Sequence, residues 1–137
     1  MEAGERDAMA IARASYERSC ARSDFFQAFY RRLFEVRPEV KPFFANTDFE
    51  RLHKLLRHAI GLLLSFPGEQ ETEPNILTRV AERHSRREMG IDPSHYPLFL
   101  ESLIDTVKRC DPEFTPTVEQ AWRTTLAKGF AYLQSKY

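Results

Sequence analysis

Histidine offers the most chemistry in this chain, and the helical pattern singles out His84. Four histidines are present, namely His53, His58, His84 and His95. His84 follows Val80 by one helical turn and Leu77 by two, so these three residues share the apolar face of one predicted helix. An imidazole on such a face is either a core histidine whose nitrogens are hydrogen-bonded or a ligand to a metal.

The number of donors limits the kind of metal site. Zinc held by protein alone takes three or four ligands, and the 2 cysteines, Cys20 and Cys110, form no CxxC motif. Haem iron takes only one histidine from the protein, because the porphyrin supplies the in-plane ligands. The chain has 11 phenylalanines, and seven of them lie within residues 25–34 and 43–49. Rings gathered in this way either fill a core or wall a pocket for a flat ligand.

The elements that would position these residues are all predicted to be helices. Apolar residues recur three or four positions apart, and no segment alternates as a half-buried strand does. Proline and glycine separate the segments, and Asp48 and Thr115 are predicted caps. The sequence therefore predicts an all-α domain of six or seven helices. They cover residues 5–19, the stretch from a Ser23 or Asp24 cap to Pro38, and residues 38–44, 48–66, 74–88, 94–109 and 116–135.

Length and charge exclude several classes of function. A chain of 137 residues suits one domain, and 20 basic residues balance 20 acidic ones, so no overall field attracts nucleic acid. The longest apolar run, residues 59–64, is too short to span a membrane, and the polar N-terminus is no signal peptide. We therefore expect a cytoplasmic monomer or weak homodimer, with neither nucleic acid nor a membrane as partner.

Two blocks of residues carry a resemblance to a known family. The first runs through Phe29-Tyr30 and Leu33-Phe34 to the segment 37–44, in which Phe44 follows Pro38 by six residues. The second joins Arg83-His84 to the segment 90–96, Gly-Ile-Asp-Pro-Ser-His-Tyr. Together they resemble the globin family, in particular bacterial single-domain globins and the globin part of flavohaemoglobins. The resemblance implies a single globin domain over residues 1–137, with helices A, B, C, E, F, G and H in a three-over-three sandwich.

The resemblance also implies a cofactor and the residues that hold it. The cofactor is haem b, bound without a covalent link, and His84 becomes the proximal iron ligand. The side chains expected to contact the haem are Phe43, Phe44, His53, Leu56, Val80, Ile91 and Tyr96.

The residues on the distal side of the iron follow from the register of the helix over 48–66. One residue lies beside the bound gas, and the residue one turn later presses on the porphyrin and must be apolar. Starting at His53 puts Arg57 against the haem, and burying an unpaired guanidinium there is costly. Starting at Leu52 puts Leu56 there, so Leu52 replaces the distal histidine or glutamine that is usual in the family.

Tyr30 is then the expected polar group of the distal pocket, with Leu52 and Leu56 beside it. A phenol donor stabilises bound O2, which becomes polarised, more than it stabilises CO. The alternative is a core tyrosine that bonds a backbone carbonyl. His53 is expected to be partly exposed near a haem propionate, or else to be a sixth iron ligand, whereas His58 and His95 are expected to be exposed.

The resemblance implies reversible binding of O2, and of NO or CO, as the function. An alternative is NO dioxygenation with an external reductase, because the chain carries no flavin or nicotinamide motif. A stand-alone gas sensor is the other alternative. The resemblance therefore leaves enzymatic activity open. In flavohaemoglobins a glutamate and a tyrosine flank the proximal histidine, and Tyr96 matches the tyrosine while Tyr137 stands at the glutamate position.

Overall fold

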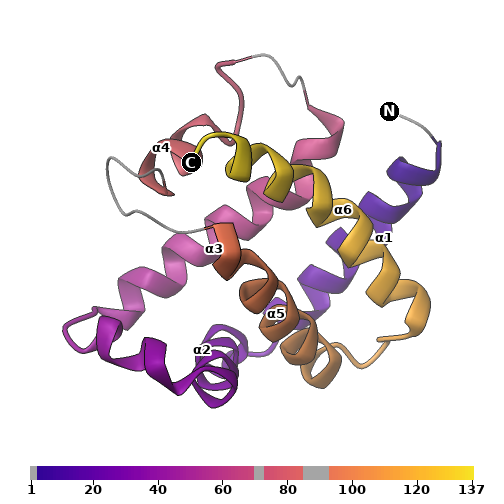
Figure 1. Ribbon diagram of the computed structural model, residues 1–137. Coiled ribbons are helices and arrows are strands. Elements are labelled where there is room, and N and C mark those ends of the chain that lie inside the picture. The colour runs from indigo at the N-terminus through magenta and orange to yellow at the C-terminus, as the bar shows by residue number, and fades with distance from the viewer. Residues whose placement is uncertain (1–2, 70–72, 85–92) are drawn as a thin grey trace.

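Helices make up all the regular structure in the residues that the computed structural model describes, which are 3–69, 73–84 and 93–137. This confirms the predicted all-α class. The elements in chain order are α1 Ala3–Cys20, α2 Phe25–Val36, the 3₁₀ segment η1 Pro38–Phe44, α3 Phe49–Ser65, η2 Phe66–Gly68, α4 Thr78–His84, η3 Pro93–His95, α5 Tyr96–Cys110 and α6 Pro116–Ser135 (Figure 1).

Two of the predicted caps are confirmed and one is not. The Asp48 side chain accepts a hydrogen bond from the Arg51 N–H at the start of α3, and Thr115 accepts one from Val118 at the start of α6. Asp24 occupies the N-cap position of α2 but makes no capping bond with its side chain, because its carboxylate pairs with Arg22 at 3.3 Å.

The helix predicted over 74–88 begins later, at Thr78. The reason is local, since the Asn75 side-chain oxygen accepts from the Leu77 N–H at 2.9 Å and the Asn75 N–H donates to Thr78 Oγ1 at 2.8 Å. These bonds give the backbone a turn in place of the first helical turn. Residues 85–88 of the predicted helix lie outside the described part of the chain.

The helices pack in crossed pairs around one core. The main contacts join α1 to α6, α2 to α5 and α3 to α6, and α4 packs on α6 (Figure 1). Trp122 and Leu126 of α6 are fully buried at the centre of this core. Gly129 lets α3 approach α6 closely, because a Cβ at that position would stand 2.6 Å from a methyl carbon of Leu63.

A buried ionic network ties α1 to Asp111 at the end of α5 and to Trp122 of α6. Asp111 is 3% exposed and accepts hydrogen bonds from Ser15 at 2.6 Å and from the Arg18 guanidinium at 2.6 and 3.0 Å. The Trp122 indole N–H donates to the Ser15 hydroxyl at 2.9 Å. Burial alone would raise the pKa of Asp111, but the bonds from Arg18 and Ser15 outweigh it and lower the pKa. We call these four residues the Asp111 network.

In the described part of the chain, no helix has both the length and the apolar character needed to cross a membrane.

Candidate functional site

Tyr30 lies among aromatic rings contributed by α2, η1 and the start of α3. Its ring centroid is 5.7 to 6.3 Å from the centroids of four neighbours. Together with these neighbours it forms what we call the aromatic cluster, which consists of Tyr30, Phe34, Phe44, Phe49 and His53. The apolar face of α2 supplies two of the rings because Tyr30 and Phe34 stand one helical turn apart.

The Tyr30 side chain is largely buried, and its hydroxyl is available as a hydrogen-bond donor. Its residue is 7% exposed, and burial raises the pKa of the hydroxyl, so the group keeps its proton at neutral pH. Among the described residues the hydroxyl has no hydrogen-bond partner, and the alternative of a core tyrosine bonded to a backbone carbonyl is not seen there. No described residue therefore occupies the phenol as a hydrogen-bond donor.

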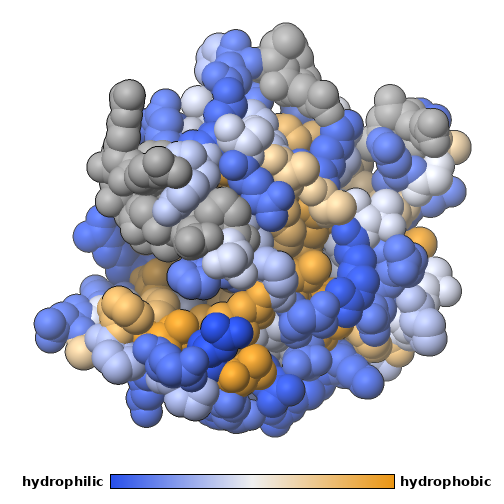
Figure 2. Space-filling model, in the orientation of Figure 1, coloured by the Kyte–Doolittle hydropathy of each residue, from blue (hydrophilic) through white to orange (hydrophobic). Residues whose placement is uncertain are grey.

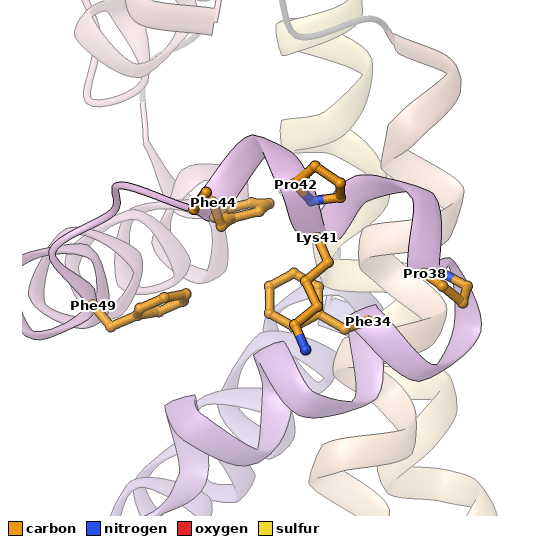
Figure 3. Close-up of a pocket in the computed structure, with 7 residues that line it drawn as sticks. Phe34, Pro38, Lys41, Pro42, Phe44 and Phe49 are labelled. Carbon is orange, nitrogen blue, oxygen red and sulfur yellow. The ribbon is translucent and has the colours of Figure 1, made fainter.

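A pocket of about 490 Å³ opens beside the cluster (Figure 3). The rings of Phe34, Phe44 and Phe49 line it together with residues of η1 and the turn after it, namely Pro38, Lys41, Pro42 and Ala45. Among these lining residues Lys41 carries the only charge. Figure 2 shows hydrophobic side chains gathered in a hollow of the same molecule where α2, α3 and α5 come together.

The burial along α3 agrees with the predicted distal register. Leu56 is 8% exposed and Leu52 is half-buried against the core, whereas Arg57 is exposed. The Arg57 guanidinium instead lies over the Phe26 ring, 5.3 Å from its centroid. Contact of Leu52 and Leu56 with a ligand stays a prediction.

His53 belongs to the aromatic cluster. Its imidazole is half-buried and lies nearly parallel to the Tyr30 ring, at 16° and 5.7 Å between centroids. The Nε2 atom is buried without a hydrogen-bond partner in the described structure. His58 and His95 are exposed, as predicted.

The residues predicted for the proximal side lie on α4 and at the start of α5. Val80 is half-buried and His84 is the last residue of α4, one turn later. Tyr96 is buried at the first position of α5 and stacks on Phe130 at 5.4 Å, and burial raises the pKa of its hydroxyl. Ile91 lies outside the described residues.

The structure does not bring Phe43 to the cluster that Phe44 joins. Phe43 is 85% exposed, because neighbouring residues of a 3₁₀ turn point about 120° apart. Conversely, sequence reasoning did not single out Phe49, which stacks on Phe44 at 6.3 Å. The spacing along the sequence could have indicated this contact, because Phe49 stands one helical turn before His53 on α3.

Comparison with known proteins shows the family. The family model described as Globin matches residues 27–133, so the chain belongs to the globin family. The chain is 32% identical to a flavohemoprotein of Vibrio cholerae over 101 residues, which are 70% of this chain and 25% of that protein. It is 25% identical to hemoglobin subunit alpha-2 of Xenopus borealis, over 81% of this chain and 80% of that subunit. The chain thus spans about a quarter of the flavohemoprotein's length.

A solved structure supports the same assignment. The protein PA3967 of Pseudomonas aeruginosa PAO1, whose structure is described as highly homologous to a human hemoglobin, superposes with a TM-score of 0.86. The two chains are 31% identical, and the match covers 95% of this chain and 98% of PA3967. The predicted globin fold is confirmed by these matches.

Proposed function

We propose that this globin holds haem b without a covalent link and binds O2 reversibly, with His84 as the proximal ligand and Tyr30 as the distal hydrogen-bond donor. The observation that carries the proposal is the Tyr30 phenol, whose residue is 7% exposed and whose hydroxyl has no hydrogen-bond partner among the described residues. A donor in apolar surroundings gains free energy from a hydrogen bond to a ligand, which supports a role for Tyr30 in gas binding.

The residues present fit a haem group. Phe44, Leu52 and Val80 pack against the core yet stay partly exposed, so a flat apolar group covering them would bury further hydrophobic surface. His84 follows Val80 by one turn at the end of α4 and supplies one imidazole. When haem is bound, its iron supplies an open coordination position for a diatomic gas.

The distal side chains would then act on the gas. Tyr30 donates a hydrogen bond to polarised dioxygen and gains less from the weakly polar CO. Leu52 and Leu56 provide no competing donor, and their apolar surface disfavours water near the phenol. The raised pKa of Tyr30 keeps it a donor throughout the physiological range. We expect slow O2 release as the result.

The first test is the absorption spectrum of the purified chain in its ferric, ferrous and ferrous-plus-O2 states, with His84→Ala beside it. We expect a haem band in the wild type that is lost or strongly altered in His84→Ala. His58→Ala is the matched control, because His58 is exposed. A chain that takes up no haem even when haem is added would contradict the proposal.

NO dioxygenation with a separate reductase is the second candidate, favoured by the likeness to a flavohemoprotein over 70% of the chain. Repeated additions of NO to the oxygenated protein with a reductant distinguish the two. Sustained NO consumption would support the dioxygenase, whereas consumption of a single equivalent would support reversible O2 binding.

A further inference from the structure

His53 is held by its flat faces between the rings of α2 and α3. The imidazole lies 6.2 Å from Phe26 at 29° and 5.7 Å from Tyr30 at 16°, and Phe49 stands 6.1 Å away at a steeper 58°. Two of these three contacts are close to parallel, which is the offset-stacked arrangement that aromatic pairs favour. The ring thus packs against two residues of α2 that stand one helical turn apart.

The Nε2 atom of the same imidazole makes no hydrogen bond in the described structure. Nε2 is buried without a partner, one of four such side-chain atoms among the described residues. The other three are hydroxyls of Ser19, Ser102 and Thr125. The contact that the structure shows for His53 is therefore stacking through its faces rather than hydrogen bonding through Nε2.

The Tyr30 ring depends on its neighbours for its orientation. No hydrogen bond within the described residues anchors its hydroxyl, so packing alone sets the direction of the phenol. Its other ring neighbours meet it at angles of 36° to 77°. His53 is the neighbour closest to parallel, and a parallel ring is the contact that blocks a swing of the phenol toward α3.

We propose that His53 is a positioning residue for Tyr30. Its imidazole stacks on the phenol and keeps the Tyr30 hydroxyl directed at the gas-binding site. This inference rests on the proposed function and explains a histidine whose contacts are those of a flat ring. It also requires that another flat ring can replace the imidazole, whereas an apolar side chain of other shape cannot.

The first measurement follows Tyr30 itself and does not depend on haem. The full chain is labelled with 3-fluorotyrosine, and its 5 tyrosines give separate fluorine resonances in NMR. Tyr30→Phe identifies the Tyr30 signal by its loss. We expect this signal to shift and broaden in His53→Leu and to stay close to the wild type in His53→Phe. His58→Leu, on the exposed face of the same helix, serves as the control.

The second measurement is the O2 dissociation rate of the haem-loaded protein. We expect His53→Leu to speed O2 release toward the rate of Tyr30→Phe, about tenfold for the loss of one hydrogen bond, while His53→Phe retains most of the slow release. The double variant Tyr30→Phe/His53→Leu should release O2 no faster than Tyr30→Phe alone, because both changes act through one group.

Three results would overturn the inference. One is a His53→Phe variant that behaves like His53→Leu in both measurements, which would assign the role to Nε2. Another is a low-spin ferrous wild type that becomes high-spin in both variants, which would make His53 an iron ligand. The third is an unmoved Tyr30 fluorine signal in His53→Leu. If the chain takes up no haem, the proposed function fails while the fluorine measurement still decides whether His53 positions Tyr30.

Discussion

The Asp111 network and the aromatic cluster treat buried polar groups in opposite ways. In the network both carboxylate oxygens of Asp111 accept hydrogen bonds, and the Trp122 N–H and the Ser15 hydroxyl are paired. In the cluster His53 Nε2 is buried without a partner in the described structure, and the hydroxyl of the largely buried Tyr30 has no hydrogen-bond partner among the described residues. Paired buried groups hold helices together, whereas unpaired ones lower stability and need another reason to be kept. The comparison therefore supports the proposed division, in which the network stabilises the fold and the cluster serves the proposed gas-binding site.

The largest expected effect comes from breaking the network. Asp111→Ala leaves Ser15 and Arg18 without their shared acceptor, and we expect the free energy of unfolding to fall by about 3 kcal/mol. Urea unfolding measures this loss. Asp105→Ala, on α5 just before Asp111, is the control, because Asp105 makes only a partly exposed pair with Arg32 at 3.0 Å and should lose far less stability. A clear change in O2 dissociation in Asp111→Ala would break the division between the regions.

The stability that the Asp111 network contributes should depend on pH. Because the pKa of Asp111 is lowered in the folded chain, the folded state binds this proton less readily than the unfolded chain does. The stability it contributes is complete above the pKa of an unfolded aspartate, about 3.9, and is lost as the pH falls from there through the folded pKa. Urea midpoints of the wild type and Asp111→Asn should therefore differ most near neutral pH and converge in acid. A constant difference would contradict the lowered pKa.

Removing the Tyr30 hydroxyl from the aromatic cluster should have the reverse effect, with little change in stability and faster O2 release. Tyr30→Phe removes a hydroxyl that has no partner in the described structure, so unfolding should change by less than about 0.5 kcal/mol while O2 dissociation speeds up about tenfold. Tyr16→Phe is the matched control, because the Tyr16 hydroxyl donates to the Arg57 carbonyl at 2.8 Å. It should lose about 1 kcal/mol of stability without changing O2 release. Stopped-flow mixing measures the O2 dissociation rate of both variants, and urea unfolding measures their stability.

The smallest effect concerns the anchoring of α4. The Tyr132 hydroxyl donates to Glu73 at 2.9 Å and lies 3.4 Å from the Thr78 hydroxyl, so it ties α6 to the start of the helix that carries His84. Tyr132→Phe should lower stability by about 0.5 kcal/mol, since these groups are partly exposed. Hydrogen exchange should quicken within residues 78–84 and stay unchanged in α1. Unaltered exchange in α4 would show that the core contacts of Leu77 hold this helix without the hydroxyl.

Local pattern accounts for the burial and exposure that were predicted correctly along α3 and at the start of α5. The inward register of Leu52 and Leu56 could be read from α3 because the alternative register would bury Arg57, and a charge on an apolar face is a strong signal. The exposure of His58 and His95 followed from the same helical geometry. The late start of α4 was missed because Asn75 and Thr78 compete for the backbone through bonds that hydrophobic periodicity does not register.

The sequence by itself determined the helices, their apolar faces and the residue types available for chemistry, because these depend on spacings of three and four along one helix. Tertiary structure alone decided which of these residues meet. Ser15 bonds Asp111 across 96 positions of the chain, and His53 stacks on Tyr30 from another helix. Such meetings depend on how closely two helices cross, and at the crossing of α3 and α6 Gly129 leaves room for a methyl group of Leu63. Helix crossing is set by the packing of whole side-chain surfaces, so no spacing within one helix encodes it.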